Sequence, residues 1–229
     1  MHAQNDTADT VEQRFAFLVN GQVHHSTDPV IDGRTILRIA AFHPPSEHVL
    51  IALTKPGSRS IGLDESFDLR TPGREDFRAF PSDRTFNFTG DEIGYEWGAR
   101  TISESDLRDI TGAPDTKDFV LERKGEPDQP INEGDVIDLG DSGTEHIRTV
   151  RALTTIIVNA EKQEVEGRRI SFAALVKLAF ETPPTGENIL ITIDYGNGPP
   201  ANPKGSLKPG ETVKIKNKMV FDVTATDRS

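Results

Sequence analysis

The chain has 229 residues and no cysteine, which excludes disulfides, thiolate metal ligands and a cysteine nucleophile. Its net charge is −11, and we expect no nucleic-acid partner because phosphate neutralisation supplies most of the affinity for nucleic acids. The N-terminal segment 1–13 lacks the basic and apolar regions of a signal peptide, and no apolar run reaches the length of a membrane span, so we expect a soluble, cytoplasmic protein without a membrane partner.

Three stretches of the sequence resemble one another, at residues 33–40, 98–110 and 167–179. Each begins with a glycine, continues through an arginine to an isoleucine, and then has apolar residues at helical spacing. The isoleucines are Ile36, Ile102 and Ile170, which are 66 and 68 residues apart. A period this regular predicts three copies of one small domain.

The first copy begins with an apolar strand at residues 15–19, a hairpin turn at Asn20-Gly21 and a more polar returning strand to residue 27. A helix is expected at residues 35–42, ended by the prolines at 44 and 45. Further strands follow, at residues 49–54, around 61–69 and at 77–80.

The second and third copies have the same order of elements. In the second copy Ser103, with Asp106 three residues later, predicts a helix N-cap, and Gly112 ends that helix. In the third copy Ser171 caps a helix expected at residues 171–180, and a longer loop occupies residues 196–205.

This pattern predicts an α+β fold in which one helix packs across a mixed sheet, the β-grasp arrangement. The sequence then divides into an N-terminal arm (1–14), three repeats (15–80, 84–150 and 154–223) and a C-terminal tail (224–229). The short linkers at residues 81–84 and 151–154 place neighbouring domains close together.

Charge is distributed unevenly: residues 1–80 carry −3, residues 81–150 carry −10 and residues 151–229 carry +2. The third repeat has a stripe of basic residues, which are Lys204, Lys208, Lys214, Lys216 and Lys218. These lysines either prevent unwanted strand pairing or bind the acidic second repeat of a neighbouring copy. The loop at residues 196–205 is either an unconstrained hairpin tip or a contact with a partner.

Polar clusters elsewhere have structural interpretations. His24-His25 and the pair His43 and His48 lack a third ligand at metal spacing, so we expect no metal site and no cofactor. The acidic pairs near Glu65 and Asp135 recur at one place in the repeat, which favours turn formation over acid–base chemistry. Ser171 is followed by a helix, and no histidine lies in the third repeat, so the serine is not a nucleophile.

Several motifs together resemble the bacterial multi-ubiquitin domain proteins. They are Phe-x-x-Leu-Val-Asn-Gly at 15–21, Gly-Arg-Thr-Ile-Leu at 33–37, Phe-Asp-Leu at 67–69, Gly-Arg-Arg-Ile-Ser-Phe at 167–172 and Leu-Lys-Pro-Gly-Glu at 207–211. The resemblance extends from Phe15 to Phe221 and implies tandem ubiquitin-like β-grasp domains without catalytic activity. It also implies E1-like, E2-like and JAB-like peptidase partners in systems associated with defence against phage.

The C-terminus departs from that resemblance. A ubiquitin-type modifier usually ends in Gly-Gly, which threads narrow enzyme sites without side-chain clash. Here the tail ends in Asp227, Arg228 and Ser229 and contains no glycine.

Two hypotheses for the function follow. In the first, an E1-like enzyme activates Ser229 and the chain is attached to targets, which predicts a mobile tail after Val223. In the second, the three domains are parts of a self-associating head-to-tail scaffold or filament, which predicts ordered termini and salt-sensitive assembly.

Overall fold

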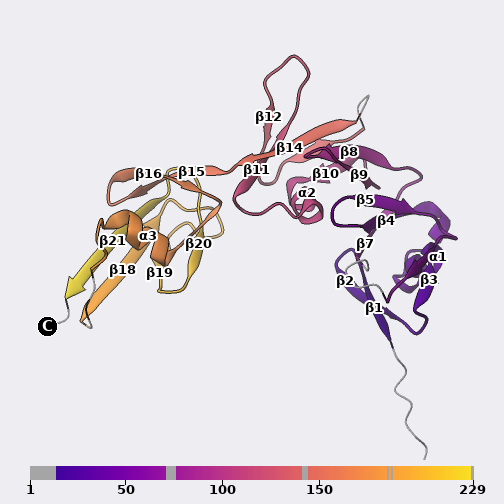
Figure 1. The fold of residues 1–229 in the computed structure, drawn as a ribbon, viewed down its shortest axis with the longest axis horizontal. Coiled ribbons are helices and arrows are strands. Elements are labelled where there is room, and N and C mark those ends of the chain that lie inside the picture. Colours follow the sequence, from indigo (N-terminus) through magenta and orange to yellow (C-terminus); the bar gives the residue numbers. More distant parts are fainter. Residues whose placement is uncertain (1–13, 71–75, 141–143, 185, 187, 228–229) are drawn as a thin grey trace, which may run out of the picture. The chain divides into compact units, whose positions relative to one another are not determined.

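The computed structural model describes residues 14–70, 76–140, 144–184, 186 and 188–227 (Figure 1). The chain forms two compact units. The first unit contains Met1–Gly112 and Leu121–Arg148, and the second contains Ala113–Val120 and Thr149–Ser229.

The same order of elements occurs three times along the chain: a hairpin, a short strand, a helix, two strands, a short strand and a final strand. In the first repeat these are β1 (Phe15–Val19), β2 (Gln22–Ser26), β3 (Val30–Asp32), α1 (Gly33–Ile39), the 3-10 turn η1 (Pro45–Glu47), β4 (His48–Leu53), β5 (Ser58–Ile61), β6 (Ser66–Asp68) and β7 (Asp76–Pro81).

The second repeat contains β8 (Phe86–Gly90), β9 (Ile93–Trp97), β10 (Thr101–Ser103), α2 (Glu104–Thr111), β11 (Lys117–Leu121), β12 (Gln129–Ile131), β13 (Val136–Asp138) and β14 (Glu145–Arg151). The third contains β15 (Leu153–Val158), β16 (Glu161–Glu166), β17 (Arg169–Ser171), α3 (Phe172–Ala179), β18 (Ile189–Gly196), β19 (Gly205–Leu207), β20 (Thr212–Lys214) and β21 (Val220–Asp227).

The sheets repeat one strand order. The third repeat forms the sheet β19-β18-β21-β15-β16, in which the first and last strands of the repeat, β15 and β21, run parallel at its centre. The same order appears twice within a single ten-stranded sheet, β12-β11-β14-β8-β9-β5-β4-β7-β1-β2. A mostly β structure with three short helices and a central parallel pair of strands is consistent with the expected α+β, ubiquitin-like β-grasp fold.

Each α-helix begins at a side-chain cap. Ser171 accepts a hydrogen bond from the N–H of Ala174 at 3.1 Å, and Ser103 does the same for Asp106 at 3.1 Å, which confirms both predicted caps. Asp32 caps α1 through the N–H of Thr35 at 2.7 Å. The side-chain oxygen satisfies one of the N–H groups that the first helical turn leaves without a partner.

Two predicted boundaries differ from the structure. The first helix ends at Ile39, before the prolines, because Ala41 takes a left-handed φ of 65° and the N–H of Phe42 bonds back to the carbonyl of Leu37 at 2.9 Å. The final strand continues to Asp227, although we expected the tail to begin at residue 224. Backbone pairing with β18 extends the strand through these four residues.

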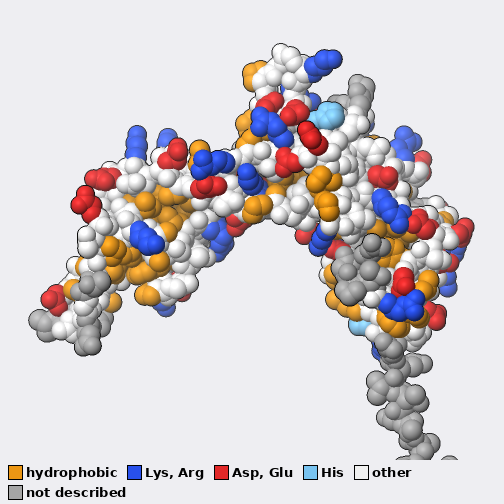
Figure 2. All heavy atoms as spheres, viewed as in Figure 1, with side chains coloured by type: hydrophobic (Ala, Val, Ile, Leu, Met, Phe, Trp, Pro, Cys, Tyr) orange, Lys and Arg blue, Asp and Glu red, His pale blue; other side chains and the backbone are white. Residues whose placement is uncertain are grey.

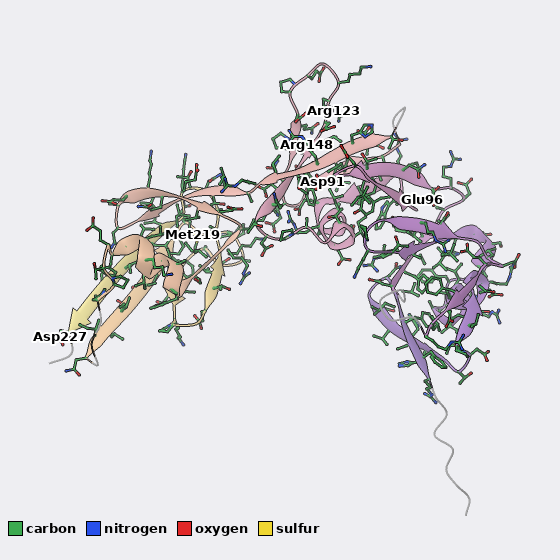
Figure 3. All side chains as sticks on the ribbon, in the orientation of Figure 1. Asp91, Glu96, Arg123, Arg148, Met219 and Asp227 are labelled. Atoms are coloured by element: carbon green, nitrogen blue, oxygen red, sulfur yellow. The ribbon has the colours of Figure 1, made fainter. Side chains whose placement is uncertain are left out.

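Apolar side chains on one face of each sheet pack beneath the helix. In the third repeat the buried cluster includes Ile156, Leu175, Val176 and Phe221 together with Met219, which Figure 3 labels. In the first repeat it includes Phe17, Ile36, Leu37 and Phe77. This burial supplies the main favourable free energy for such small repeats.

Candidate partner-binding surfaces

The last strand positions the C-terminal residues. Asp227 is exposed at the end of β21, where Figure 3 labels it, and its Cα pairs with Ile189 of β18. The hydroxyls of Thr224 and Thr192 are 2.6 Å apart across the same two strands. Arg228 and Ser229, the other residues predicted for conjugation, lie outside the described residues. The segment from Thr224 to Asp227 is therefore part of the sheet.

The basic residues of the third repeat gather around its long loop. Asn197 donates to the carbonyl of Lys218 at 2.7 Å and Asn202 donates to that of Lys214 at 3.4 Å, so the loop between β18 and β19 lies along the segment from Lys214 to Lys218. Lys204 belongs to this loop, whereas Lys208 lies in the turn after β19. Lys204, Lys208, Lys216 and Lys218 are exposed and form no ion pair within the part of the chain that the structure describes. In Figure 2, acidic and basic side chains are interspersed over the face that is drawn.

The first and second repeats are joined at a sheet edge. Strand β5 of the first repeat pairs in parallel with β9 of the second, with Ser58 opposite Tyr95. The hydroxyl of Ser58 donates to the carbonyl of Glu96 at 2.7 Å and accepts from its N–H at 3.1 Å. The carboxylate of Glu96, labelled in Figure 3, accepts from the N–H of Ser60 at 2.7 Å. In each of these three bonds a side chain pairs with a backbone group of the other strand.

Apolar and ionic contacts reinforce this junction. The rings of Phe80 and Trp97 meet edge to face with centroids 4.6 Å apart. Ile51 and Leu53 are 0% and 1% exposed, although they alternate with the residues of β4 that face the core of the first repeat. Arg78 joins its neighbour Asp76 to Asp109 of α2, at 2.5 Å from each. The outer face of the first sheet is therefore buried at β4.

The hairpin turns show where the second repeat departs from the other two. The side chain of Asn20 donates to the carbonyl of Ala79 at 3.1 Å and accepts from its N–H at 2.9 Å. The side chain of Asn159 does the same with Val223 of the last strand, at 3.0 and 2.8 Å. Asp91 occupies the same position in the second repeat. Its backbone N–H donates to the carbonyl of Ile147, just as the N–H groups of Asn20 and Asn159 donate to the carbonyls of Phe77 and Phe221. An ionised aspartate has no donor, so it cannot form both side-chain bonds.

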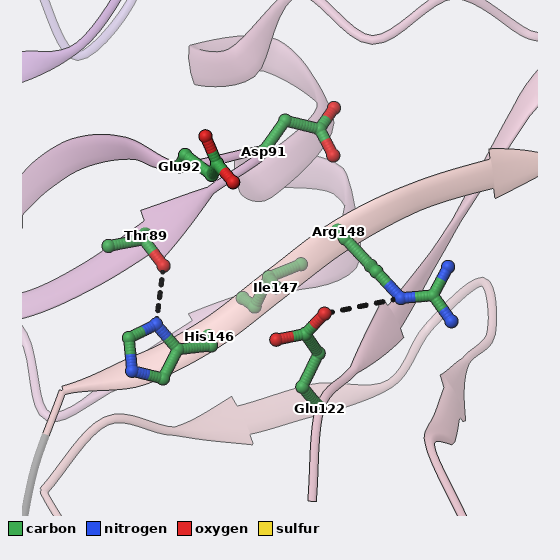
Figure 4. A pocket seen from close by; sticks show the side chains of 7 residues that line it. All are labelled: Thr89, Asp91, Glu92, Glu122, His146, Ile147 and Arg148. Atoms are coloured by element: carbon green, nitrogen blue, oxygen red, sulfur yellow. Dashed lines mark hydrogen bonds and ion pairs between the residues drawn. The ribbon is translucent and has the colours of Figure 1, made fainter.

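A surface hollow of about 530 Å³ lies beside this turn in the second repeat. It is lined by Thr89, Asp91, Glu92, Glu122, His146, Ile147 and Arg148 (Figure 4). Thr89 Oγ1 and His146 Nδ1 are 2.8 Å apart, and Arg148 pairs with Glu122 at 3.3 Å and with Asp128. The hollow is open to solvent, and most of its lining side chains are polar or charged, with both signs of charge.

The hollow contains a hydroxyl beside an imidazole, which is one requirement of nucleophilic catalysis. Such a pair also needs a third group that orients the imidazole. Within the described residues, His146 has no hydrogen bond to a carboxylate. No group of three or more histidine and acidic side chains is placed to hold a metal ion there or elsewhere in the described chain.

One histidine of each pair in the first repeat packs against an aromatic ring. His24 lies against the ring of Phe17 with centroids 5.7 Å apart, and His48 lies against Phe42 at 5.3 Å. His48 Nδ1 is 2.9 Å from the carbonyl of Pro44. His24 and His48 therefore each pack against a phenylalanine ring.

The recurring acidic pairs form turns, as predicted. Glu65 accepts from the N–H of Gly62 at 3.2 Å, and Asp135 accepts from the N–H of Asn132 at 2.7 Å. Glu211 accepts from the N–H of Lys208 in the same way at 2.9 Å. Hydrogen bonds from Arg59 and Gly62 lower the pKa of Glu65. These bonds also show that Gly62, Asn132 and Lys208 are equivalent positions of the three repeats.

Two aspartates at equivalent strand ends have depressed pKa values. Hydrogen bonds from the side chain and backbone of Arg70 lower the pKa of Asp68 to about 2. The pKa of Asp138 is lowered by the side chain of Arg100, 2.9 Å away, and by the N–H of Gly140. Both carboxylates are ionised at neutral pH.

The sequence profile of Multiubiquitin matches residues 15–82 and 154–227, which together make up more than half of the chain. The chain belongs to the Multiubiquitin family. No curated protein and no solved structure matches it significantly. None of the helices in the described Multiubiquitin chain is long and apolar enough to cross a membrane.

The matched ranges of this Multiubiquitin protein correspond to the first and third repeats, and the second match ends with β21. These two repeats share the asparagine that bonds to the last strand, whereas the second repeat has Asp91. The asparagines stand at equal places in Val-Asn-Gly and Val-Asn-Ala, a signal from which their shared role could have been predicted. The Ser58–Glu96 junction has no comparable signal, because it joins strands 38 residues apart in different repeats.

Proposed function

We propose that this protein is a non-catalytic ubiquitin-like protein with three tandem β-grasp domains, at residues 15–81, 86–151 and 153–227. It acts in the cytoplasm within a bacterial conjugation-like system, with E1-like, E2-like and JAB-like peptidase partners, and serves defence against phage. Its attachment to targets or partners is through the C-terminus. The observation that carries this proposal is the membership of the Multiubiquitin family, joined to a strand order that occurs three times.

The arrangement of the polar side chains supports a role without catalysis. The hydroxyl–imidazole pair of Thr89 and His146 lies on an open surface, and the neighbouring Arg148 is engaged by two carboxylates. Such an open surface, on which Arg148 is already paired with Glu122 and Asp128, suits recognition of a partner.

The pairing of β21 adds a requirement to C-terminal attachment. Thr224 to Asp227 are bonded to β18, so an activating enzyme that threads the C-terminal segment must first separate these residues from the sheet. Their side chains are exposed, and separation therefore exposes little apolar surface. We expect activation to depend on this local opening.

The test is to express the chain with E1-like and E2-like proteins encoded beside it and to identify adducts by mass spectrometry. We expect an isopeptide or ester linkage from Ser229 to a target, and its loss in a variant that ends at Asp227. A Lys208→Ala variant is the matched control, because it leaves the C-terminal strand unchanged. Adducts that persist without Ser229, or their absence with active enzymes, would contradict C-terminal attachment.

A second candidate function is a self-associating, head-to-tail scaffold. The exposed lysines of the third repeat, which form no ion pairs in the described residues, and the −10 charge of residues 81–150 favour it. Light scattering at low and high salt tests this function. Particles that dissociate at high salt would support the scaffold, and a monomer at both salt concentrations would exclude it.

A further inference from the structure

The junction between β5 and β9 defines how one strand edge of this fold receives another. The receiving residue, Glu96, offers a backbone N–H, a backbone carbonyl and a carboxylate. The incoming strand supplies a serine hydroxyl at Ser58 for the first two groups and the backbone N–H of Ser60 for the third. The two strands run parallel.

The receiving position can be located in the other repeats. Glu96 follows the turn residue Asp91 by five positions, and the turn residues Asn20 and Asn159 place His25 and Glu164 at the same point. Of these two, only Glu164 has the carboxylate that receives an N–H. It is exposed in β16, and β16 is an edge of its sheet among the described residues. Strand β16 therefore has the receiving groups of β9 without an incoming strand.

The incoming strand can be compared in the same way. The equivalent turns place Asp128, just before β12, and Lys204, just before β19, at the position of Ser58. They place Pro130 of β12 and Ser206 of β19 at the position of Ser60. Proline has no N–H to donate, so β12 cannot make the bond that Ser60 makes. Lysine has no acceptor for a backbone N–H, so β19 cannot replace Ser58. Neither equivalent edge in the described chain reproduces β5.

We propose that β16 is a docking edge for an extended segment of another protein, which adds parallel to β16 as β5 adds to β9. The segment carries serine or threonine opposite Glu164, and two positions later a residue other than proline, whose N–H reaches the Glu164 carboxylate. Strand addition of this kind takes its affinity from main-chain hydrogen bonds and its specificity from side chains.

The charges of β16 restrict which strand can bind. Glu161, Lys162, Glu164 and Glu166 are exposed along this edge, and charged edges resist unselective pairing. Arg151 bonds to Glu166 at 2.8 Å, and this bond raises the pKa of Arg151. A segment that donates to Glu164 is accepted, and one that brings further acidic side chains is repelled.

The test does not depend on C-terminal attachment. A capped peptide with the sequence of residues 57–62, Gly-Ser-Arg-Ser-Ile-Gly, is titrated into the ¹⁵N-labelled full-length chain. We expect saturable amide shifts in β16, with a dissociation constant on the order of 1 mM, which is typical of a few main-chain bonds. The Glu164→Lys variant should weaken binding at least about tenfold, whereas Glu164→Gln retains a carbonyl acceptor and most of the affinity.

Two control peptides examine the incoming strand. Proline in place of the second serine should abolish the shifts, and alanine in place of the first should weaken them. Absence of saturable shifts in β16, or shifts unaffected by Glu164→Lys, would overturn the proposal. Shifts in β16 that depend on protein concentration without peptide would also overturn it, because a second copy would then occupy the edge.

Discussion

The hydroxyl of Ser58 bonds to both backbone groups of Glu96, at 2.7 Å to the carbonyl and 3.1 Å to the N–H. Ser58 is 7% exposed, so water cannot readily replace the hydroxyl. These bonds lie beside the Ser58–Tyr95 strand pair, through which the two repeats share one ten-stranded sheet.

We expect Ser58→Ala to lower the free energy of unfolding by about 1–3 kcal/mol, because it leaves buried backbone groups without partners. Urea denaturation measures this loss. Ser60→Ala is the matched control, since Ser60 contributes its backbone N–H, and it should change stability by less than about 0.5 kcal/mol. Equal losses for the two variants would contradict the role of the hydroxyl.

Gly98→Ala should loosen the packing between the first and second repeats. A Cβ at Gly98 would lie 2.7 Å from Cγ of Phe80, whose ring packs on Trp97, so the ring must move. We expect a loss of about 1–3 kcal/mol, as for other overpacked sites. The fluorescence of Trp97, the one tryptophan in the sequence, reports the change. At Gly94, in β9, an added Cβ would have no atom within 4 Å, so Gly94→Ala should leave the emission unchanged.

Asn159→Asp should destabilise the third repeat at neutral pH by about 1–2 kcal/mol, because an ionised carboxylate cannot donate to the carbonyl of Val223. The carbonyl disfavours the charged form, so the folded-state pKa of the new carboxyl lies above its unfolded value of about 3.9. The deficit relative to the native chain is therefore complete above the folded pKa and shrinks as pH falls through it. Urea denaturation at pH 7 and pH 4 compares the stability of Asn159→Asp with that of the native chain. A loss of stability that does not depend on pH would contradict a raised pKa of the new carboxyl.

Arg70→Gln should return the pKa of Asp68 from about 2 towards its ordinary value of 3.8. Because the folded pKa of Asp68 lies below the unfolded one, its stabilising effect is complete above about pH 4 and is lost as pH falls towards 2. Carboxyl NMR titration of Asp68 measures the shift directly. Arg100→Gln is the control, which should raise the pKa of Asp138 and leave that of Asp68 unchanged; an unaltered Asp68 titration in Arg70→Gln would contradict the pairing.

Local signals in the sequence predicted most elements of each repeat. Ser103 and Ser171 marked helix starts, and Asn20-Gly21 marked a hairpin, because a cap or a tight turn depends on residues within a few positions of one another. The end of the first helix was misplaced because nothing in the sequence marks Ala41 as left-handed, whereas the prolines beyond it are a recognised signal for a helix end. The extent of β21 was missed because Thr224 to Asp227 become a strand through pairing with β18, about 35 residues away.

By itself, the sequence determined the threefold recurrence of one strand and helix order, since periodic apolar residues, caps and turns act locally in each copy. Only the tertiary structure decided which strand edges meet. Ser58 and Glu96 are ordinary polar residues in the sequence, and so are Pro130 and Glu164. Their importance comes from the outward direction of backbone N–H and carbonyl groups at a sheet edge, which is fixed when distant strands pair.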